Sequence, residues 1–297
     1  MCMNPEMAAE ITLQPVCRFG FDAAIIFSDI LTVPFALGQD VKFEENVGPT
    51  LNAVNSSAGL VADRDAWRTK LAPAYETLQR VRAELSPGTA LLGFAGAPWT
   101  LATYMAAGRG GDEQKAAKLW GYRDPESFGK LLELIGDCVA QHLIWQLEAG
   151  ADAVQIFDSW ASGLPARAFA DWVIAPTKRI VDKVRAARPD AKIIGFPRGA
   201  TLQGYEAYAR ETGVDALSVD TAAPLDWMAR LASWVTVQGN LDPLLLVTGG
   251  PAMERAVDEI VDAMRGRRFI FNLGHGVLQE TPPEHVSALV TRVRAAR

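Results

Sequence analysis

The sequence predicts an α/β fold, a TIM-type (β/α)8 barrel in which seven strands are visible and the first βα unit is missing. A Gly-X-Asp-Ala repeat precedes three apolar runs, there are seven such runs in all, and a helix-like stretch follows each of them. Strand and helix in alternation are typical of a parallel sheet covered by helices. With 297 residues, of which 49% are apolar, the chain is long enough for one such domain over residues 1–297.

The repeat begins at Gly20, Gly150 and Gly213. Helix-like stretches at 124–149 and 202–212 lead directly into the second and third copies. A glycine after the last helical residue can adopt the left-handed backbone conformation that ends a helix at low steric cost. We therefore expect each copy to mark the change from a helix to a buried strand.

The same reasoning extends along the chain. The predicted strands are 24–27, 90–96, 154–157, 193–197, 217–219, 235–239 and 268–273. The predicted helices are 65–85, 124–149, 166–188, 202–212, 224–233, 251–265 and 283–294. An open doubly wound sheet is the alternative, but no Gly-rich dinucleotide motif follows any strand, which favours the barrel.

The strand count is one short of a closed barrel, which needs eight. Residues 4–10 resemble the start of a helix, so a strand before that helix would precede Met1. We therefore expect one βα unit of about 30 to 40 residues to be absent. Because two sheet edges and part of the core would then be open, we expect the 297-residue chain to be poorly stable and nearly inactive.

Composition excludes several classes of protein. The chain has 29 basic and 35 acidic residues, a net charge of −6, and no basic cluster, which is against a nucleic-acid partner. The most apolar window, 23–38, is broken by Asp29 and Pro34 and is too short to cross a membrane. Three scattered cysteines form neither a disulfide framework nor a zinc pattern, so we expect a cytoplasmic protein without a metal site.

Polar residues follow the predicted strands, and in a parallel barrel all strand ends meet at one mouth. Asp29 and Ser159 lie at the same offset after their repeat glycines, so alternation places both on the same strand face. If this face is inward, both side chains point into the mouth. The alternative for Asp29 is a cap on the following turn. Capping is also the expected role of Asp220, which precedes Thr221.

Three further candidates stand near the mouth. His275 lies in a Gly-flanked turn at a strand end and is the expected site histidine; His142 is inside a helix, and His285 is in the first turn of the last helix, expected at the surface. Tyr104 follows a helix start one turn beyond a strand end, within reach of the mouth. Arg198 follows another strand end, and its planar guanidinium is suited to binding a carboxylate.

Four motifs in order make the sequence similar to the uroporphyrinogen decarboxylase family. They are Ile-Phe-Ser-Asp-Ile-Leu at 26–31, Gly-Phe-Ala-Gly-Ala-Pro-Trp-Thr at 93–100, Val-Gln-Gly-Asn-Leu-Asp-Pro at 237–243 and Asn-Leu-Gly-His-Gly at 272–276. The likeness runs from about residue 4 to residue 285. Four separate motifs in the right order make the resemblance specific.

This resemblance implies a (β/α)8 barrel, usually a homodimer, that works without a metal or organic cofactor. The implied reaction removes the carboxyl groups from the four acetate side chains of uroporphyrinogen III and gives coproporphyrinogen III in haem and tetrapyrrole synthesis. By the same resemblance, Asp29 matches the aspartate that binds the pyrrole N–H groups, and Tyr104, Ser159 and His275 match residues that contact the substrate. A protonated pyrrole can accept the electrons that carbon dioxide leaves behind, which agrees with a cofactor-free site.

The sequence departs from the family at one place. The family carries an Arg-Gln-Ala-Gly-Arg-Tyr motif on its first strand, and this sequence has no counterpart. The identity of the acid that protonates the pyrrole therefore stays open, as does the activity of this chain.

Two other functions stay open at this stage. A zinc-dependent methyltransferase of the same fold would hold its metal through His and Cys, but the cysteines fall in none of the strand-end motifs. A non-catalytic tetrapyrrole-binding protein is the second alternative, and the missing arginines make it more plausible for this chain.

Overall fold

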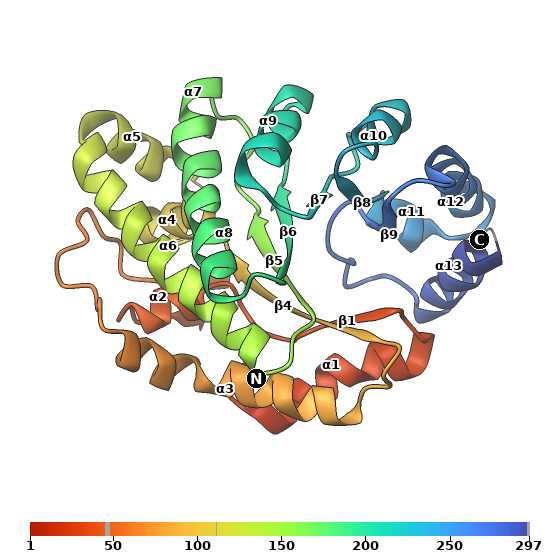
Figure 1. The fold of residues 1–297 in the computed structure, drawn as a ribbon, viewed down its shortest axis with the longest axis horizontal. Coiled ribbons are helices and arrows are strands. Elements are labelled where there is room, and N and C mark those ends of the chain that lie inside the picture. The colour runs from red at the N-terminus through yellow and green to blue at the C-terminus, as the bar shows by residue number, and fades with distance from the viewer. Residues whose placement is uncertain (45–47, 111, 296–297) are drawn as a thin grey trace.

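The computed structural model describes residues 1–44, 48–110 and 112–295, and its centre is one curled sheet of seven parallel strands (Figure 1). All six neighbouring pairs are parallel. In the order of the sheet, the strands are β1 (Ala23–Ile25), β4 (Ala90–Gly96), β5 (Ala153–Asp158), β6 (Lys192–Pro197), β7 (Ala216–Ser218), β8 (Thr236–Leu241) and β9 (Phe269–Leu273). This confirms the predicted fold class and each predicted strand within about three residues.

Helices cover the outer side of the curled sheet (Figure 1). Those that the sequence predicts are α3 (Arg64–Glu84), α6 (Pro125–Glu148), α8 (Ala175–Ala187), α9 (Leu202–Thr212), α10 (Leu225–Leu231), α12 (Gly250–Met264) and α13 (Pro283–Ala295). The predicted helix 166–188 is interrupted, because α7 (Ala166–Phe169) passes into a π-helical turn at Ala170–Ile174 before α8 begins. No helix in the described ranges has both the length and the apolar composition that a membrane crossing requires.

The remaining elements are short or lie near the chain start. They are α1 (Pro5–Phe19), α2 (Thr32–Ala36), α4 (Pro98–Ala107), α5 (Lys115–Arg123), α11 (Pro243–Thr248) and the antiparallel pair β2 (Lys42–Glu44) and β3 (Gly48–Thr50). Helix α1 begins as expected, with Asn4 accepting a hydrogen bond from the Met7 N–H and a proline in the first turn.

The repeat glycines have the conformation that the sequence predicts. Gly20, Gly150 and Gly213 have φ angles of 68°, 111° and 77°. An L-amino acid with a side chain is strained at these angles, so glycine is the residue that allows each helix to turn directly into a strand.

In the second and third copies, the aspartate of the repeat has a structural role at the N-terminal ends of the strands. The Asp152 N–H donates to the Leu91 carbonyl at 2.7 Å, and the Asp152 carboxylate accepts from the Leu91 N–H at 2.7 Å and from Arg82 at 2.8 Å. Asp215 repeats this arrangement with Ile193 and Arg185. We call these two residues the aspartate clamps. Each clamp fixes a strand to its neighbour and to the helix that precedes that neighbour.

Strands β1 and β9 are the two edges of the sheet within the described residues. At the β1 edge, the Phe27 N–H donates to the hydroxyl of Thr12 in α1 at 2.9 Å. Helix α13 reaches the same region, where Arg294 bonds the Gly20 carbonyl and lies 3.4 Å from the Asp22 carboxylate. Helices α1 and α13 therefore meet beside the N-terminal end of β1.

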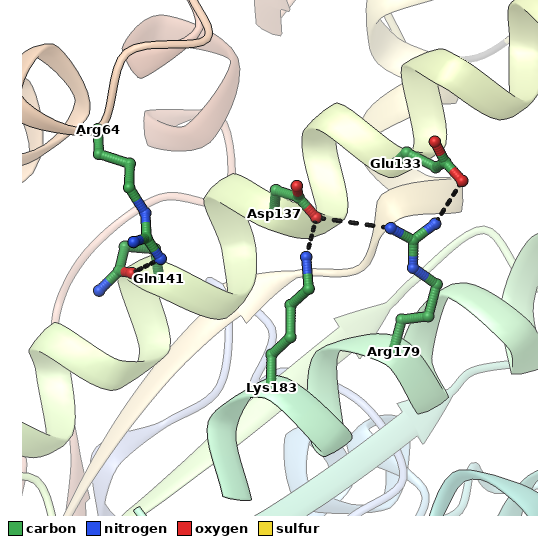
Figure 2. Close-up of polar contacts among 6 residues, drawn as sticks. All are labelled: Arg64, Glu133, Asp137, Gln141, Arg179 and Lys183. Atoms are coloured by element: carbon green, nitrogen blue, oxygen red, sulfur yellow. Dashed lines mark hydrogen bonds and ion pairs between the residues drawn. The ribbon is translucent and has the colours of Figure 1, made fainter. Parts of the chain in front are cut away.

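Helices α6 and α8 pack side by side and share a row of ion pairs (Figure 2). Arg179 in α8 lies 2.6 Å from Glu133 and 3.8 Å from Asp137 in α6, and Lys183 also pairs with Asp137. These side chains are about half exposed. Water and salt screen them, so each pair contributes at most about 1 kcal/mol. The packing of apolar residues beneath them is the larger stabilising contribution.

Two histidines are distant from the strand ends. His142 in α6 is 2% exposed, and its Nδ1 lies 2.9 Å from the Tyr75 hydroxyl, which agrees with the predicted place inside a helix. His285 is partly buried rather than a free surface residue. Its ring lies 3.0 Å and 3.1 Å from the carbonyls of Leu246 and Val247, so it joins α13 to the end of α11.

The aspartate clamps lead to a stability prediction. Asp152→Ala leaves the N–H of the fully buried Leu91 without this acceptor, so we expect a loss of about 1 to 3 kcal/mol in the free energy of unfolding. Urea denaturation measures it. Asp190→Ala is the control, because Asp190 is exposed and 3.9 Å from its partner Arg188, and we expect a change within about 0.5 kcal/mol. Equal losses in the two variants would contradict the clamp.

A second prediction concerns pH. Burial lowers the pKa of His142 from 6.5 to about 3, so the folded protein keeps this ring neutral while the unfolded chain takes up a proton below pH 6.5. The corresponding stability is present above pH 6.5 and is lost as the pH falls. Between pH 7 and pH 5 we expect wild type to lose about 2 kcal/mol more than His142→Gln. Parallel urea titrations at both pH values measure this; equal losses would refute it.

Candidate functional site

The predicted site residues lie at the C-terminal ends of the strands, in two groups. Asp29, Tyr104 and Ser159 belong to the side of β1, β4 and β5, whereas Arg198 and His275 belong to the side of β6 and β9. Within the described residues, these five side chains form no hydrogen bond or ion pair with one another. The structure thus places them at one end of the sheet without direct contacts between them.

Asp29 follows β1 and is partly buried. Its carboxylate accepts a hydrogen bond from the Leu31 N–H at 2.7 Å, so Asp29 does cap the following turn, which is the alternative that the sequence leaves open. Burial raises the pKa of Asp29, and the bond from Leu31 partly offsets this effect. The Asp29 charge in turn contributes to a raised pKa of Cys2, after the larger effect of burial on that thiol. Sequence reasoning missed the nearness of Cys2.

Ser159 lines a cavity of about 530 Å³. The same cavity is lined by Ser28 and Ile30, which flank Asp29, and by Phe94 and Phe157. The two phenyl rings are 5.5 Å apart and nearly perpendicular. The cavity also extends along α1 and β1, where it is lined by Ile11, Thr12, Pro15, Val16 and the residues from Ala23 to Phe27. It therefore follows the edge of the sheet up to the segment that carries Asp29.

Tyr104 lies in the second turn of α4, the helix opened by Pro98 as the sequence predicts. Its ring meets that of Trp160 edge-on, with the centroids 6.2 Å apart. A Cβ atom on Gly110 would lie 3.2 Å from Tyr104 Cε1, so the loop after α4 passes close to the ring. Tyr104 is thus held between this loop and the segment that follows β5.

Arg198, Asp220 and His275 form an electrostatic group on the other side. Partial burial lowers the pKa of His275, the Arg198 charge lowers it further, and the Asp220 carboxylate opposes both. Asp220 also accepts hydrogen bonds from the Gly199 N–H at 2.7 Å and from the Tyr205 hydroxyl at 3.0 Å. The expected capping role of Asp220 is confirmed by its bond from the Ala222 N–H, and it also holds the turn after Arg198.

Polar residues inside the barrel were only partly foreseen. Gln238 donates to Gln155 at 3.3 Å and to Ser218 at 3.2 Å, three residues on three strands. Asn240 donates to the carbonyls of Asp220 and Ala223. Alternation along each strand predicts the inward direction of these side chains, but it does not predict which of them meet.

The described residues contain no group of three or more His, Cys, Asp or Glu side chains arranged to hold a metal ion. The mouth instead offers two partly buried carboxylates, Asp29 and Asp220, together with two serines, a tyrosine, and a guanidinium near an imidazole. These groups can bind N–H donors and carboxylates.

Comparison with known proteins decides the family. The sequence profile described as uroporphyrinogen decarboxylase (URO-D) matches residues 1–296. The chain belongs to the uroporphyrinogen decarboxylase family. Among similar relatives, the uroporphyrinogen decarboxylase of Chelativorans sp. (strain BNC1) is 50% identical over 297 residues, 100% of this chain and 86% of the relative. That of Brucella anthropi is 48% identical and covers 100% of this chain and 87% of the relative.

Solved structures of two other proteins share the fold. A methyltransferase from Methanosarcina mazei has a TM-score of 0.84 at 18% identity, and the match covers 99% of this chain and 86% of that one. A B12-independent methionine synthase from Shewanella sp. W3-18-1 has a TM-score of 0.63 at 9% identity, covering 98% and 86%. At such identities the likeness shows the fold alone.

The charges around His275 lead to a prediction. Arg198→Gln removes a positive charge and should raise the pKa of His275, whereas Asp220→Asn removes a negative charge and should lower it. The NMR titration of the His275 ring measures both. Arg292→Gln, on the outer helix α13, is the control and should leave the titration unchanged. An identical His275 titration in all four proteins would show that these charges do not act on the ring.

Proposed function

We propose that this chain removes the carboxyl groups from the four acetate side chains of uroporphyrinogen III and releases coproporphyrinogen III, a step in haem and tetrapyrrole synthesis. The match of the family profile over residues 1–296 supports this reaction. The observation that carries the proposal in the structure is Asp29, a partly buried carboxylate beside an apolar cavity.

Asp29 has the role of binding the central pyrrole N–H groups. A carboxylate can accept several charge-assisted hydrogen bonds, each contributing about 1.5 to 3 kcal/mol. Burial raises the pKa of Asp29, and N–H donors or a cationic ring beside it favour the ionised form and oppose that effect. The negative charge then stabilises positive charge as it develops on the macrocycle.

The chemistry requires no electron acceptor other than the substrate. Protonation turns a pyrrole into an electron-poor cation. The bond between the methylene carbon and the carboxylate breaks, carbon dioxide leaves, and the electron pair moves into the ring. Addition of a proton to the methylene carbon gives the methyl group, and loss of the first added proton restores the pyrrole. Each cycle consumes one proton and releases one carbon dioxide.

The other residues suit the remaining parts of the substrate. The phenyl rings of Phe94 and Phe157 offer apolar contacts to the non-planar macrocycle of a porphyrinogen, and Ser159 lines the same cavity. Arg198 and His275 follow β6 and β9 at the same end of the sheet, where they can hold carboxylate side chains of the substrate. Tyr104 can donate a hydrogen bond to a carboxylate or to Asp29.

We also propose a homodimer in the cytoplasm. The homodimer rests on the family resemblance, and sedimentation of the purified chain tests it. The reducing compartment is supported by the cysteines Cys2, Cys17 and Cys138, which are all free thiols.

The decarboxylation is tested under single-turnover conditions, with enzyme in excess over uroporphyrinogen III, because this format detects slow chemistry. Mass spectrometry follows the stepwise loss of four carbon dioxide molecules. Asp29→Asn keeps the shape and removes the charge, so we expect the rate to fall at least about 100-fold. The control is Asp40→Asn, an exposed aspartate in the same segment that pairs with Lys42.

A wild-type chain that binds uroporphyrinogen but releases no carbon dioxide would overturn the proposal in favour of a tetrapyrrole-binding protein. If Asp29→Asn matched Asp40→Asn in rate, the role of Asp29 would be wrong. Zinc in the purified protein at one equivalent per chain would instead favour a methyltransferase.

A further inference from the structure

Asp158, the last residue of β5, is a fully buried carboxyl group behind the mouth. It is 0% exposed. Because side chains alternate along a strand, Asp158 points away from Phe157 and Ser159 and into the layer between the sheet and its helices. The candidate site uses the residue next to it, and nothing in the proposed chemistry uses Asp158 itself.

The carboxyl group of Asp158 is bound to the first turn of α4. The Thr100 hydroxyl donates to Asp158 Oδ1 at 2.5 Å. Helix α4 begins after Ala97, which has no side-chain oxygen to cap it. The Thr100 backbone, as well as its hydroxyl, favours the ionised form of Asp158. Asp158 therefore supplies, from another strand, the kind of acceptor that a helix start usually receives from its own N-cap residue.

The same threonine connects to the segment after β5. The Trp160 N–H donates to Thr100 Oγ1 at 3.1 Å, and the Trp99 indole N–H donates to the Trp160 carbonyl at 2.8 Å. The Thr100 hydroxyl thus binds the side chain of Asp158 and the backbone of Trp160, the two residues that flank Ser159. In addition, Trp160 carries the ring that packs against Tyr104.

The backbone of Asp158 extends the network to the next strand. The Arg198 N–H donates to the Asp158 carbonyl at 3.1 Å. One residue and its hydrogen-bonded threonine are therefore connected to the segments that present Ser159, Tyr104 and Arg198.

Burial of the Asp158 carboxyl group lowers the free energy of unfolding, so stability does not explain why this residue is an acid. Burial raises the pKa of Asp158 to about 7, and Thr100 offsets only part of this effect. The second oxygen, Oδ2, has no hydrogen-bond partner among the described residues. An apolar side chain at this place would avoid the cost of burying an acid. A residue that breaks this rule is expected where function requires it.

We propose that Asp158 and Thr100 form a positioning pair, which ties the end of β5 to the first turn of α4 and so sets where Ser159 and Tyr104 meet the substrate. This inference rests on the proposed function for the identity of the substrate. The pair does not touch the reacting atoms. Its loss is expected to weaken substrate binding while the fold persists.

The test compares two buried threonines. Thr100→Val keeps the shape and removes the hydroxyl from both partners, whereas Thr100→Ser restores the hydroxyl. Thr77→Val is the matched control: Thr77 is also 0% exposed and donates a single bond to the Pro73 carbonyl inside α3, away from the mouth. Melting temperatures show whether the two valine variants lose similar stability.

Binding and chemistry are measured separately. Fluorescence titration with uroporphyrin III gives a dissociation constant, and single-turnover decarboxylation of uroporphyrinogen III gives a rate constant and a half-saturating concentration. For Thr100→Val we expect both the dissociation constant and the half-saturating concentration to rise about tenfold. The rate constant at saturation should change less. Thr100→Ser and Thr77→Val should stay within about twofold of wild type.

The outcomes separate the two proposals. If Thr100→Val binds uroporphyrin III as Thr77→Val does, the positioning role is wrong, whatever the turnover. If wild type binds uroporphyrin III but performs no decarboxylation, the proposed function is wrong, and the dissociation constants still decide the positioning role. If the threonine variants differ in binding as expected and Thr100→Ser restores it, the positioning role is supported.

Discussion

The aspartate clamps are the constraint on which the arrangement of the mouth depends. Asp152 and Asp215 each bind the strand beside their own through a backbone bond in one direction and a carboxylate bond in the other. A strand that slipped by one residue would turn its inward side chains outward. The clamps oppose such a slip at the N-terminal ends of the strands. They therefore help to place Ser159 and Arg198 in the same mouth. These two residues follow the C-terminal ends of β5 and β6, and the clamps bind the N-terminal ends of the strands.

The clamps also explain why the repeat is visible in the sequence. Its glycine ends a helix, its aspartate binds a neighbouring strand, and its apolar run enters the core. Because these three tasks fall on consecutive residues, local patterns predict the seven strands and most of the long helices. Short elements such as α5 and α11 are missed, since a few residues do not establish a helical period.

The candidate site is predicted less completely than the fold. Strand-end positions identify Asp29, Ser159, Arg198 and His275, because parallel strands bring their ends together. Contacts between distant segments do not follow from any pattern. The bond between Thr100 and Asp158 joins residues 58 positions apart, and that between Gln155 and Gln238 spans 83. Both depend on how layers pack, which a single sequence does not specify.

The hydroxyl of Thr12 has a consequence for the exposed side of β1. It donates to the Ala8 carbonyl within α1 and accepts from the Phe27 N–H, so a helix occupies a hydrogen-bonding position that another strand would otherwise use. At β9, Ile270 is 41% exposed. Amide hydrogen exchange should therefore be graded across the sheet, slowest in β5 and β6 and fastest along the unpaired flank of β9. Within the ranges that the structure describes, a helix side chain accepts from a backbone N–H at the β1 flank, and no helix side chain does so at the β9 flank.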